Sequence, residues 1–365
     1  MSASLNNEAL QETRDLPKLD NSYNSSNIAI SSDGIDDVVT LNIDSETIIF
    51  VNHVLLCSAI GLFGIVTNAI NICVFIKQGL NTSINISLFS IALFDLVKIF
   101  AMQSINIVSN PLVIELVGSR MILDAFYLIG GWPAACAHRI SLFITVYMTV
   151  ERCLCVSFPL KIRTWITPRV AFITVSAIIL VNVLTLIPEY TTIYIDWVVV
   201  PGRNTSTLGL VFTSNRPAMQ GLTFIIHAIF LFVGIIVVVS LTLGLVLLIR
   251  RKSEWRNRNT TNDKQKYSLS VRDKKMSQLV IILATVLIVY YLPMVILSLV
   301  TVFMPDFSPE GKLGLLFLTL WSFGHVFGIT NPSVNIFIYY KMSSYFREKF
   351  KELFRLVLSS KSITE

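Results

Sequence analysis

The stretch ISLFITVYMTVERCLCVSFPL, residues 140–160, passes from uncharged, largely apolar residues into an adjacent acid and base, Glu151 and Arg152. Pro159 follows, and basic residues resume at Lys161. Apolar runs of this kind cross membranes as helices, and their charged residues collect where the helix meets water. The stretch therefore predicts a membrane-spanning helix with a charged end at the water boundary.

The same pattern recurs along the whole chain. Of the 365 residues, 53% are hydrophobic and only 14% are charged, which is too apolar for an ordinary soluble domain. Seven apolar runs are each long enough to cross about 30 Å of hydrocarbon. They cover residues 48–76, 84–108, 126–156, 168–187, 221–249, 276–303 and 313–340. We therefore expect an all-α membrane protein, a seven-transmembrane-helix bundle.

Charge placement predicts the orientation of this bundle. Lys and Arg cluster after the third, fifth and seventh runs, whereas the first segment is acidic. The positive-inside rule places the N-terminus outside the cell and the C-terminus in the cytoplasm, as expected for a multi-pass plasma-membrane protein. Sequons at Asn24 and Asn204 then face the outside, where they can be glycosylated. Basic residues that flank apolar runs do not indicate nucleic-acid binding.

Composition divides the chain into four segments. Residues 1–47 are polar and predict a disordered extracellular tail, and residues 48–340 form the transmembrane domain. Residues 341–358 place apolar side chains on one helical face and Lys and Arg on the other, which predicts a short cytoplasmic amphipathic helix on the membrane surface. Residues 359–365 are left as a cytoplasmic tail.

Five motifs occur in order on the predicted helices. TNAIN contains Asn68, SLFSIALFD ends at Asp95, ERC covers residues 151–153, YYLP covers 290–293 and NPSVN covers 331–335. By these motifs, residues 48–358 resemble a rhodopsin-like (class A) G-protein-coupled receptor. Residues 127–169 look like molluscan candidate chemosensory receptors, some of which resemble FMRFamide receptors.

The resemblance implies a receptor that converts an extracellular chemical signal into activation of a heterotrimeric G protein. A chemosensory role leads, a neuropeptide role is the alternative, and a transporter or channel subunit is a rival. No nucleophile–base or metal motif supports an enzyme. The implied activation switch comprises Glu151, Arg152, Asp273, Tyr291, Pro293, Asn331, Pro332 and Asn335.

The switch and the membrane interior each leave alternatives open. We expect Arg152 to contact Asp273 across two helices, unless both charges extend into lipid headgroups. The resemblance implies a sodium ion near Asp95, within a polar cluster of Asn68, Asp95, Lys98 and Asn331. Alternatively, Asp95 is protonated and hydrogen-bonds between helices, or Lys98 replaces sodium as its counter-charge.

Departures from the family pattern affect the switch and the outer loops. Cys153, Tyr291 and Asn335 stand where the family has Tyr, Trp and Tyr. Tyr127 replaces a cysteine, and the second outer loop has none, so we predict that no extracellular disulfide forms.

Residues at particular positions of the predicted helices narrow the possible classes of ligand. Ala134 and His325 occupy the positions of the amine-receptor Asp and the opsin Lys, which disfavours amines and retinal. If they converge, the candidate ligand residues form a cationic pocket for a carboxylate, a phosphate or an acidic peptide end. They are Lys98, His138, Arg139, Tyr290, Tyr291, Trp321 and His325. Alternatively, Arg139 pairs with Asp124 or Glu189, and the histidines are hydrogen-bonded core residues that hold no metal.

The predicted orientation can be tested with a tag after Glu365. Because an odd number of spans places this end in the cytoplasm, antibody should label intact cells only after permeabilisation. Labelling of unpermeabilised cells would contradict the predicted topology.

Overall fold

A computed structural model describes residues 45–108, 110, 112–113, 126–158, 161–199, 206–259, 266–304, 306–307 and 312–361. These residues belong to one compact unit. Asn24, Asn204 and nearly all of the predicted N-terminal tail lie outside them, so glycosylation and the disorder of the tail stay predictions.

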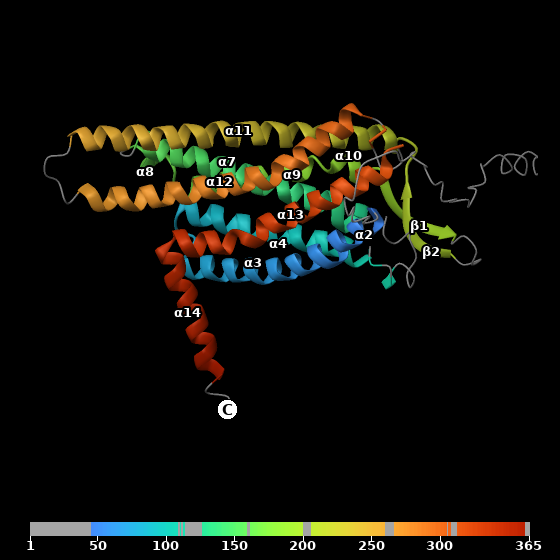
Figure 1. The fold of residues 1–365 in the computed structure, drawn as a ribbon, viewed down its shortest axis with the longest axis horizontal. Helices are drawn as coiled ribbons and strands as arrows, with labels where there is room; N and C mark the ends of the chain where they lie inside the picture. Colours follow the sequence, from blue (N-terminus) through green and yellow to red (C-terminus); the bar gives the residue numbers. More distant parts are fainter. Residues whose placement is uncertain are drawn as a thin grey trace, which may run out of the picture. The chain divides into compact units, whose positions relative to one another are not determined.

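Long helices lie side by side and form the bundle (Figure 1). The first is built from α2 (Ser45–Phe50), a π-helical stretch η1 (Val51–Cys57) and α3 (Ser58–Gln78). The others are α4 (Ser83–Val108), α7 (Gly131–Ser157, preceded by η2, Phe126–Gly130), α9 (Pro168–Leu184), α11 (Arg216–Asn259), α12 (Lys266–Phe303) and α13 (Gly314–Met342). Each predicted apolar run is thus helical, and the chain has the predicted all-α membrane fold.

The composition of the helices matches a membrane environment. Within the described ranges, six helices are long and apolar enough to cross a bilayer. The seventh, α13, has 29 residues but contains His325, Asn331 and Asn335, which make it less apolar. Asn331 and Asn335 are buried, so α13 turns polar groups toward the bundle interior. Large apolar side chains such as Phe172 and Leu243 are exposed on the outside, as contact with lipid requires.

Local signals in the sequence set several helix ends. Thr167 caps α9, because its hydroxyl accepts a hydrogen bond from the Val170 amide, and Pro168 occupies the first turn. Gly79 ends α3 with a φ of 80°, a conformation that favours glycine. Pro293 and Pro332 both lie inside helices, α12 and α13 respectively.

The two ends of the bundle differ (Figure 1). One end carries strands β1 (Ile193–Val199) and β2 (Ser206–Phe212), and we call it the hairpin end. The other carries α8 (Ile162–Trp165) and the predicted amphipathic helix, α14 (Ser344–Lys361), and we call it the α14 end. Phe346 of α14 is buried with its ring centroid 5.5 Å from that of Phe75 and 5.6 Å from that of Tyr339. This aromatic contact fixes the start of α14 to α3 and α13.

The predicted second outer loop contains an antiparallel hairpin that the sequence analysis did not predict. β1 pairs with β2 in a register that places Ile193 opposite Phe212. No disulfide holds this loop, since all five cysteines are free.

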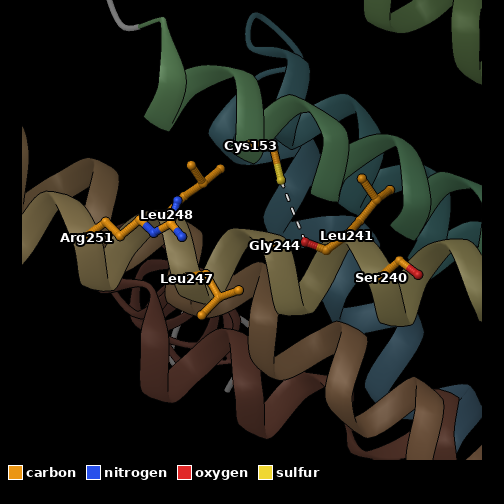
Figure 2. A pocket seen from close by; sticks show the side chains of 7 residues that line it. All are labelled: Cys153, Ser240, Leu241, Gly244, Leu247, Leu248 and Arg251. Carbon is orange, nitrogen blue, oxygen red and sulfur yellow. Dashed lines mark hydrogen bonds between the residues drawn. The ribbon is translucent and has the colours of Figure 1, made fainter.

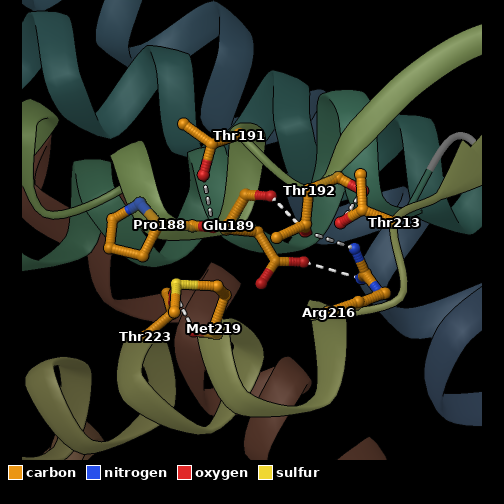
Figure 3. Close-up of polar contacts among 8 residues, drawn as sticks. All are labelled: Pro188, Glu189, Thr191, Thr192, Thr213, Arg216, Met219 and Thr223. Carbon is orange, nitrogen blue, oxygen red and sulfur yellow. Dashed lines mark hydrogen bonds and ion pairs between the residues drawn. The ribbon is translucent and has the colours of Figure 1, made fainter.

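A buried ion pair closes the base of the hairpin instead (Figure 3). Arg216, at the start of α11, donates from Nη2 to Glu189 Oε1 at 2.7 Å and from Nη1 to Thr192 Oγ1 at 3.2 Å. Glu189 belongs to the short helix α10 (Ile187–Tyr190). The Arg216 guanidinium also stacks 4.0 Å from the ring centroid of Phe212. This group ties α10, the hairpin and α11 together, which is the role a disulfide would otherwise have in this loop.

Replacing Arg216 with Met should destabilise the protein strongly. The change leaves the buried Glu189 carboxylate without its counter-charge, and breaking a buried pair from one side costs about 3–5 kcal/mol. We expect a lower Tm for the purified protein in micelles. Lys349→Met is the control, because it breaks a solvent-accessible pair with Glu352 on α14 and should leave Tm unchanged. Equal Tm values for the two variants would contradict the proposed role of the ion pair.

Candidate functional site

Asp95 is buried in α4 and is held by two neighbouring helices. Its Oδ1 accepts a hydrogen bond from Ser141 Oγ of α7 at 3.0 Å. Its Oδ2 accepts one from Asn335 Nδ2 of α13 at 2.8 Å. Asn335 stands where the family resemblance leads one to expect Tyr, and its amide is a donor that suits a carboxylate. Asp95 therefore links α4 to α7 and α13.

Lys98, one turn further along α4, links three helices. Its ammonium donates to the carbonyl oxygen of Gly328 at 2.6 Å and to Tyr291 Oη of α12 at 3.2 Å. Asn331 Nδ2 donates to the same hydroxyl at 3.3 Å. Within the described part of the chain, no ion pair within 4.0 Å joins Lys98 to Asp95. The two side chains thus have separate hydrogen-bonding partners within one polar region.

Pro332 explains why the Gly328 carbonyl is available. In an α-helix, the amide N–H of a residue bonds the carbonyl four residues earlier, and proline has no N–H. The carbonyl of Gly328, four residues before Pro332, therefore lacks its helical donor, and Lys98 supplies one from another helix. We call this the Lys98 tether.

Asn68 links α3 to α13 without contacting Asp95. Its Nδ2 donates to the Pro332 carbonyl at 3.0 Å and to the Gly64 carbonyl at 2.9 Å. A Cβ on Gly64 would lie 2.2 Å from Ser333 Oγ, so glycine is needed for the two helices to approach. The predicted cluster is therefore divided between an Asp95 group and a Lys98 tether, with Asn68 beside Pro332. The sodium ion near Asp95 stays a prediction.

The predicted ligand residues fall into four contact groups. His138 stacks on Tyr291 with ring centroids 3.6 Å apart, beside the Lys98 tether. His325 contacts Trp321 (ring centroids 6.4 Å apart) and His53 of η1 (4.7 Å). Tyr290 packs against Phe327 in a third group, and Arg139 forms a fourth with partners of its own. These contacts therefore do not join all seven predicted residues in one pocket.

Arg139 is fully buried and is held by neutral partners. Its Nη1 lies 3.0 Å from His227 Nδ1 of α11, and its Nη2 donates to Thr185 Oγ1 at 2.6 Å and, at 3.5 Å, to the Asn182 carbonyl. The alternative of a pair with Glu189 is wrong, because that carboxylate binds Arg216. Asp124 lies outside the described residues.

At the α14 end, Glu151 and Arg152 form a buried ion pair within α7. Ser83 Oγ, at the start of α4, donates to Glu151 Oε2 at 2.5 Å and lies 3.1 Å from Tyr147 Oη. The side chain of Asp273 lies outside the described part of α12, so the Arg152–Asp273 contact stays a prediction.

A shallow groove of about 280 Å³ lies beside this ion pair, between α7 and α11 (Figure 2). Cys153, which replaces the expected Tyr, points into it, and its Sγ lies 3.7 Å from the Leu241 carbonyl oxygen. Three leucines, Ser240, Gly244 and Arg251, all of α11, form the rest of the lining. Cys153 thus contacts α11, while Arg152 turns toward Glu151.

Several residues of these groups were missed by sequence reasoning. Ser83, Ser141 and Thr185 gave no signal, because serine and threonine are common on membrane helices, and His227 was expected only as a hydrogen-bonded core histidine. Gly328 could have been found, since a proline four residues later always leaves a helical carbonyl without its donor.

The comparison with known families agrees with this architecture. A model of the family described as serpentine type 7TM GPCR chemoreceptor Srw matches residues 56–357. The chain belongs to this family, so it is a membrane-spanning receptor of the chemoreceptor type and not an enzyme. No curated protein matches the chain. The finer resemblance to rhodopsin-like and molluscan receptors stays a prediction.

Tyr291→Phe tests the Lys98 tether. The change removes the hydroxyl that Lys98 and Asn331 share, and an unsatisfied buried donor costs about 1–3 kcal/mol. We expect a lower Tm for the purified receptor. The adjacent Tyr290→Phe is the control, because its hydroxyl makes no hydrogen bond in the part of the chain that the structure describes. If both variants unfold at the same temperature, the tether contributes nothing.

Proposed function

We propose that this serpentine-type receptor converts the binding of an extracellular chemical ligand into activation of a heterotrimeric G protein. The observation that carries the proposal is the position of Arg152. Its guanidinium is buried at the α14 end, paired with Glu151, which is itself bound by Ser83 of a different helix. A cation restrained at the edge of the bundle is suited to change partners when helices move.

The placement of charge supports a cytoplasmic α14 end. α11 extends well beyond its apolar part and carries Arg250, Arg251 and Lys252 there, and α14 adds Arg347 and Lys349. Figure 1 places α14 and the last turns of α11 at the end opposite the hairpin. We place the protein in the plasma membrane. By the positive-inside rule, its hairpin end and its N-terminus then lie outside the cell.

The Lys98 tether provides a connection between the two ends. It joins α4 to α12 and α13 at the proline-containing part of α13. A ligand that binds better to an arrangement lacking these contacts would shift the population toward that arrangement. Movement of α12 and α13 would then open the α14 end, where the G protein binds.

The ligand is proposed to be a chemosensory cue, in keeping with the chemoreceptor family. A neuropeptide of the FMRFamide type is the second candidate. The hairpin favours it, because Ile195 and Trp197 are exposed on one face of β1 and offer an apolar surface to a peptide.

Ser83→Ala should raise ligand-independent signalling. It removes a hydrogen bond to the Glu151 carboxylate, and a loss of about 1.4 kcal/mol would shift a two-state equilibrium about tenfold. The measurement is basal second-messenger production in cells that express a promiscuous Gα subunit, normalised to receptor at the surface. Asp273→Asn should act in the same direction if it binds Arg152.

Ser90→Ala is the matched control for Ser83. It lies on the same helix, but its hydroxyl bonds only the Ile86 carbonyl of its own helix. Basal signalling that is equal in the Ser83 and Ser90 variants would contradict a restraining role for Ser83. Absence of any G-protein response in all variants, including after broad ligand screening, would contradict the proposed function itself.

A further inference from the structure

The surroundings of Arg139 contain hydrogen-bond donors and lack a counter-charge. Arg139 is fully buried, and its Nε–H has no hydrogen-bond partner in the described part of the chain. Trp132 lies seven residues earlier on α7, so both side chains lie on the same face. The buried indole N–H of Trp132 also lacks a partner among the described residues. Both side chains contact one residue of α11, His227, with the Trp132 ring 6.1 Å from the imidazole.

The carboxylates of the neighbouring helices are already bound elsewhere. Asp95 of α4 accepts hydrogen bonds from Ser141 and Asn335, and Glu189 of α10 is paired through Oε1 with Arg216, while its buried Oε2 has no hydrogen-bond partner among the described residues. No carboxylate of a described residue lies within 4.0 Å of Arg139. The side chain of Cys136 lies near the guanidinium, but a thiol carries no charge and does not supply a counter-charge. An unpaired guanidinium buried in this way costs several kcal/mol, which an anion would recover.

We propose that Arg139, Trp132 and His227 form a binding site for the carboxylate group of the receptor's ligand. The inference rests on the proposed function, because it assigns the ligand its anionic group. A carboxylate suits the guanidinium, because its two oxygens accept from the guanidinium N–H groups, and the indole N–H of Trp132 offers a further donor on the side of the hairpin end. Lys98 is bound to Gly328 and Tyr291, so the site offers one formal cation and matches a monoanion better than a phosphate dianion.

The position of the site suits a ligand that enters from the hairpin end. Seven residues of helix span about 10 Å, so Trp132 lies that far above Arg139 toward the hairpin. Trp132 contacts Phe224 with ring centroids 4.9 Å apart, and α11 thereby covers the guanidinium. The site is closed in this structure. Entry of a carboxylate requires α7 and α11 to separate at Trp132, which couples ligand binding to helix movement.

Thermal unfolding of the purified full-length receptor tests the site, with sodium benzoate as the probe. Benzamide has the same ring but no charge, and sodium chloride supplies a different anion at equal ionic strength. We expect benzoate alone to raise Tm in a saturable manner. A shift given by chloride and not by benzoate would overturn the assignment to a carboxylate, and no shift with benzoate would overturn the site.

Three variants define which residues bind the probe. Arg139→Met should abolish the benzoate shift without lowering Tm in its absence, because an unpaired buried charge is replaced by an apolar side chain. Trp132→Phe keeps the aromatic ring and should raise the half-maximal benzoate concentration several-fold. Arg251→Met, an exposed change on α11, should retain the full shift. A normal benzoate shift in Arg139→Met would refute the proposal.

The benzoate-dependent change in Tm distinguishes failure of this inference from failure of the proposed function. Benzoate binding is measured without a G protein, so a receptor that binds benzoate through Arg139 but never activates a G protein refutes only the proposed function. A receptor that signals but shows no Arg139-dependent shift refutes only the carboxylate site.

Discussion

The missing amide hydrogen of Pro332 is the constraint on which the centre of the bundle depends. It leaves the Gly328 carbonyl without a helical donor, and in a membrane no water replaces that donor cheaply. Lys98 fills the gap from α4 and uses Tyr291 as its second acceptor. One backbone defect in α13 thus fixes the relative positions of three helices through a single ammonium group.

The buried charges of the bundle differ in how the protein satisfies them. Glu151 is paired with Arg152, Glu189 is paired with Arg216, and Asp95 accepts two hydrogen bonds. The two ion pairs lie at opposite ends of the bundle, and the Asp95 group lies in its interior. Arg216 and Asp95 connect different elements directly, whereas the Glu151–Arg152 pair lies within α7 and is linked to α4 by Ser83. Lys98 and Arg139 both bind neutral partners, but Lys98 lies one turn of α4 from the Asp95 carboxylate, whereas no carboxylate of a described residue lies within 4.0 Å of Arg139. A membrane protein keeps such a charge when something outside the fold satisfies it, and this is why a ligand group is the natural partner.

Sequence alone predicted the helices well and the contacts poorly, for physical reasons. Apolar length and charge placement determine which segments cross a bilayer, so all seven spans were found. Side-chain partners depend on how the helices are rotated and packed, and no periodicity in one sequence encodes this. For this reason Glu189 was a predicted partner of Arg139, although the structure pairs that acid with Arg216 at the base of the hairpin. The hairpin itself was missed because the outer loop gave no clear strand pattern and lacked the cysteine that would have anchored it.

The contacts of Lys98 and Asp95 explain two departures from the family pattern, Tyr291 and Asn335. Tryptophan has only a hydrogen-bond donor on its ring, so it could not accept from Lys98, whereas the hydroxyl of Tyr291 accepts from both Lys98 and Asn331. Asn335 brings an amide donor to Asp95 at the next turn of α13. A lysine in α4 therefore requires an acceptor in α12, and Asp95, which makes no ion pair with Lys98, requires donors from α7 and α13. The three unusual residues Lys98, Tyr291 and Asn335 form one consistent arrangement, and changing any one of them alone leaves a buried polar group without a partner.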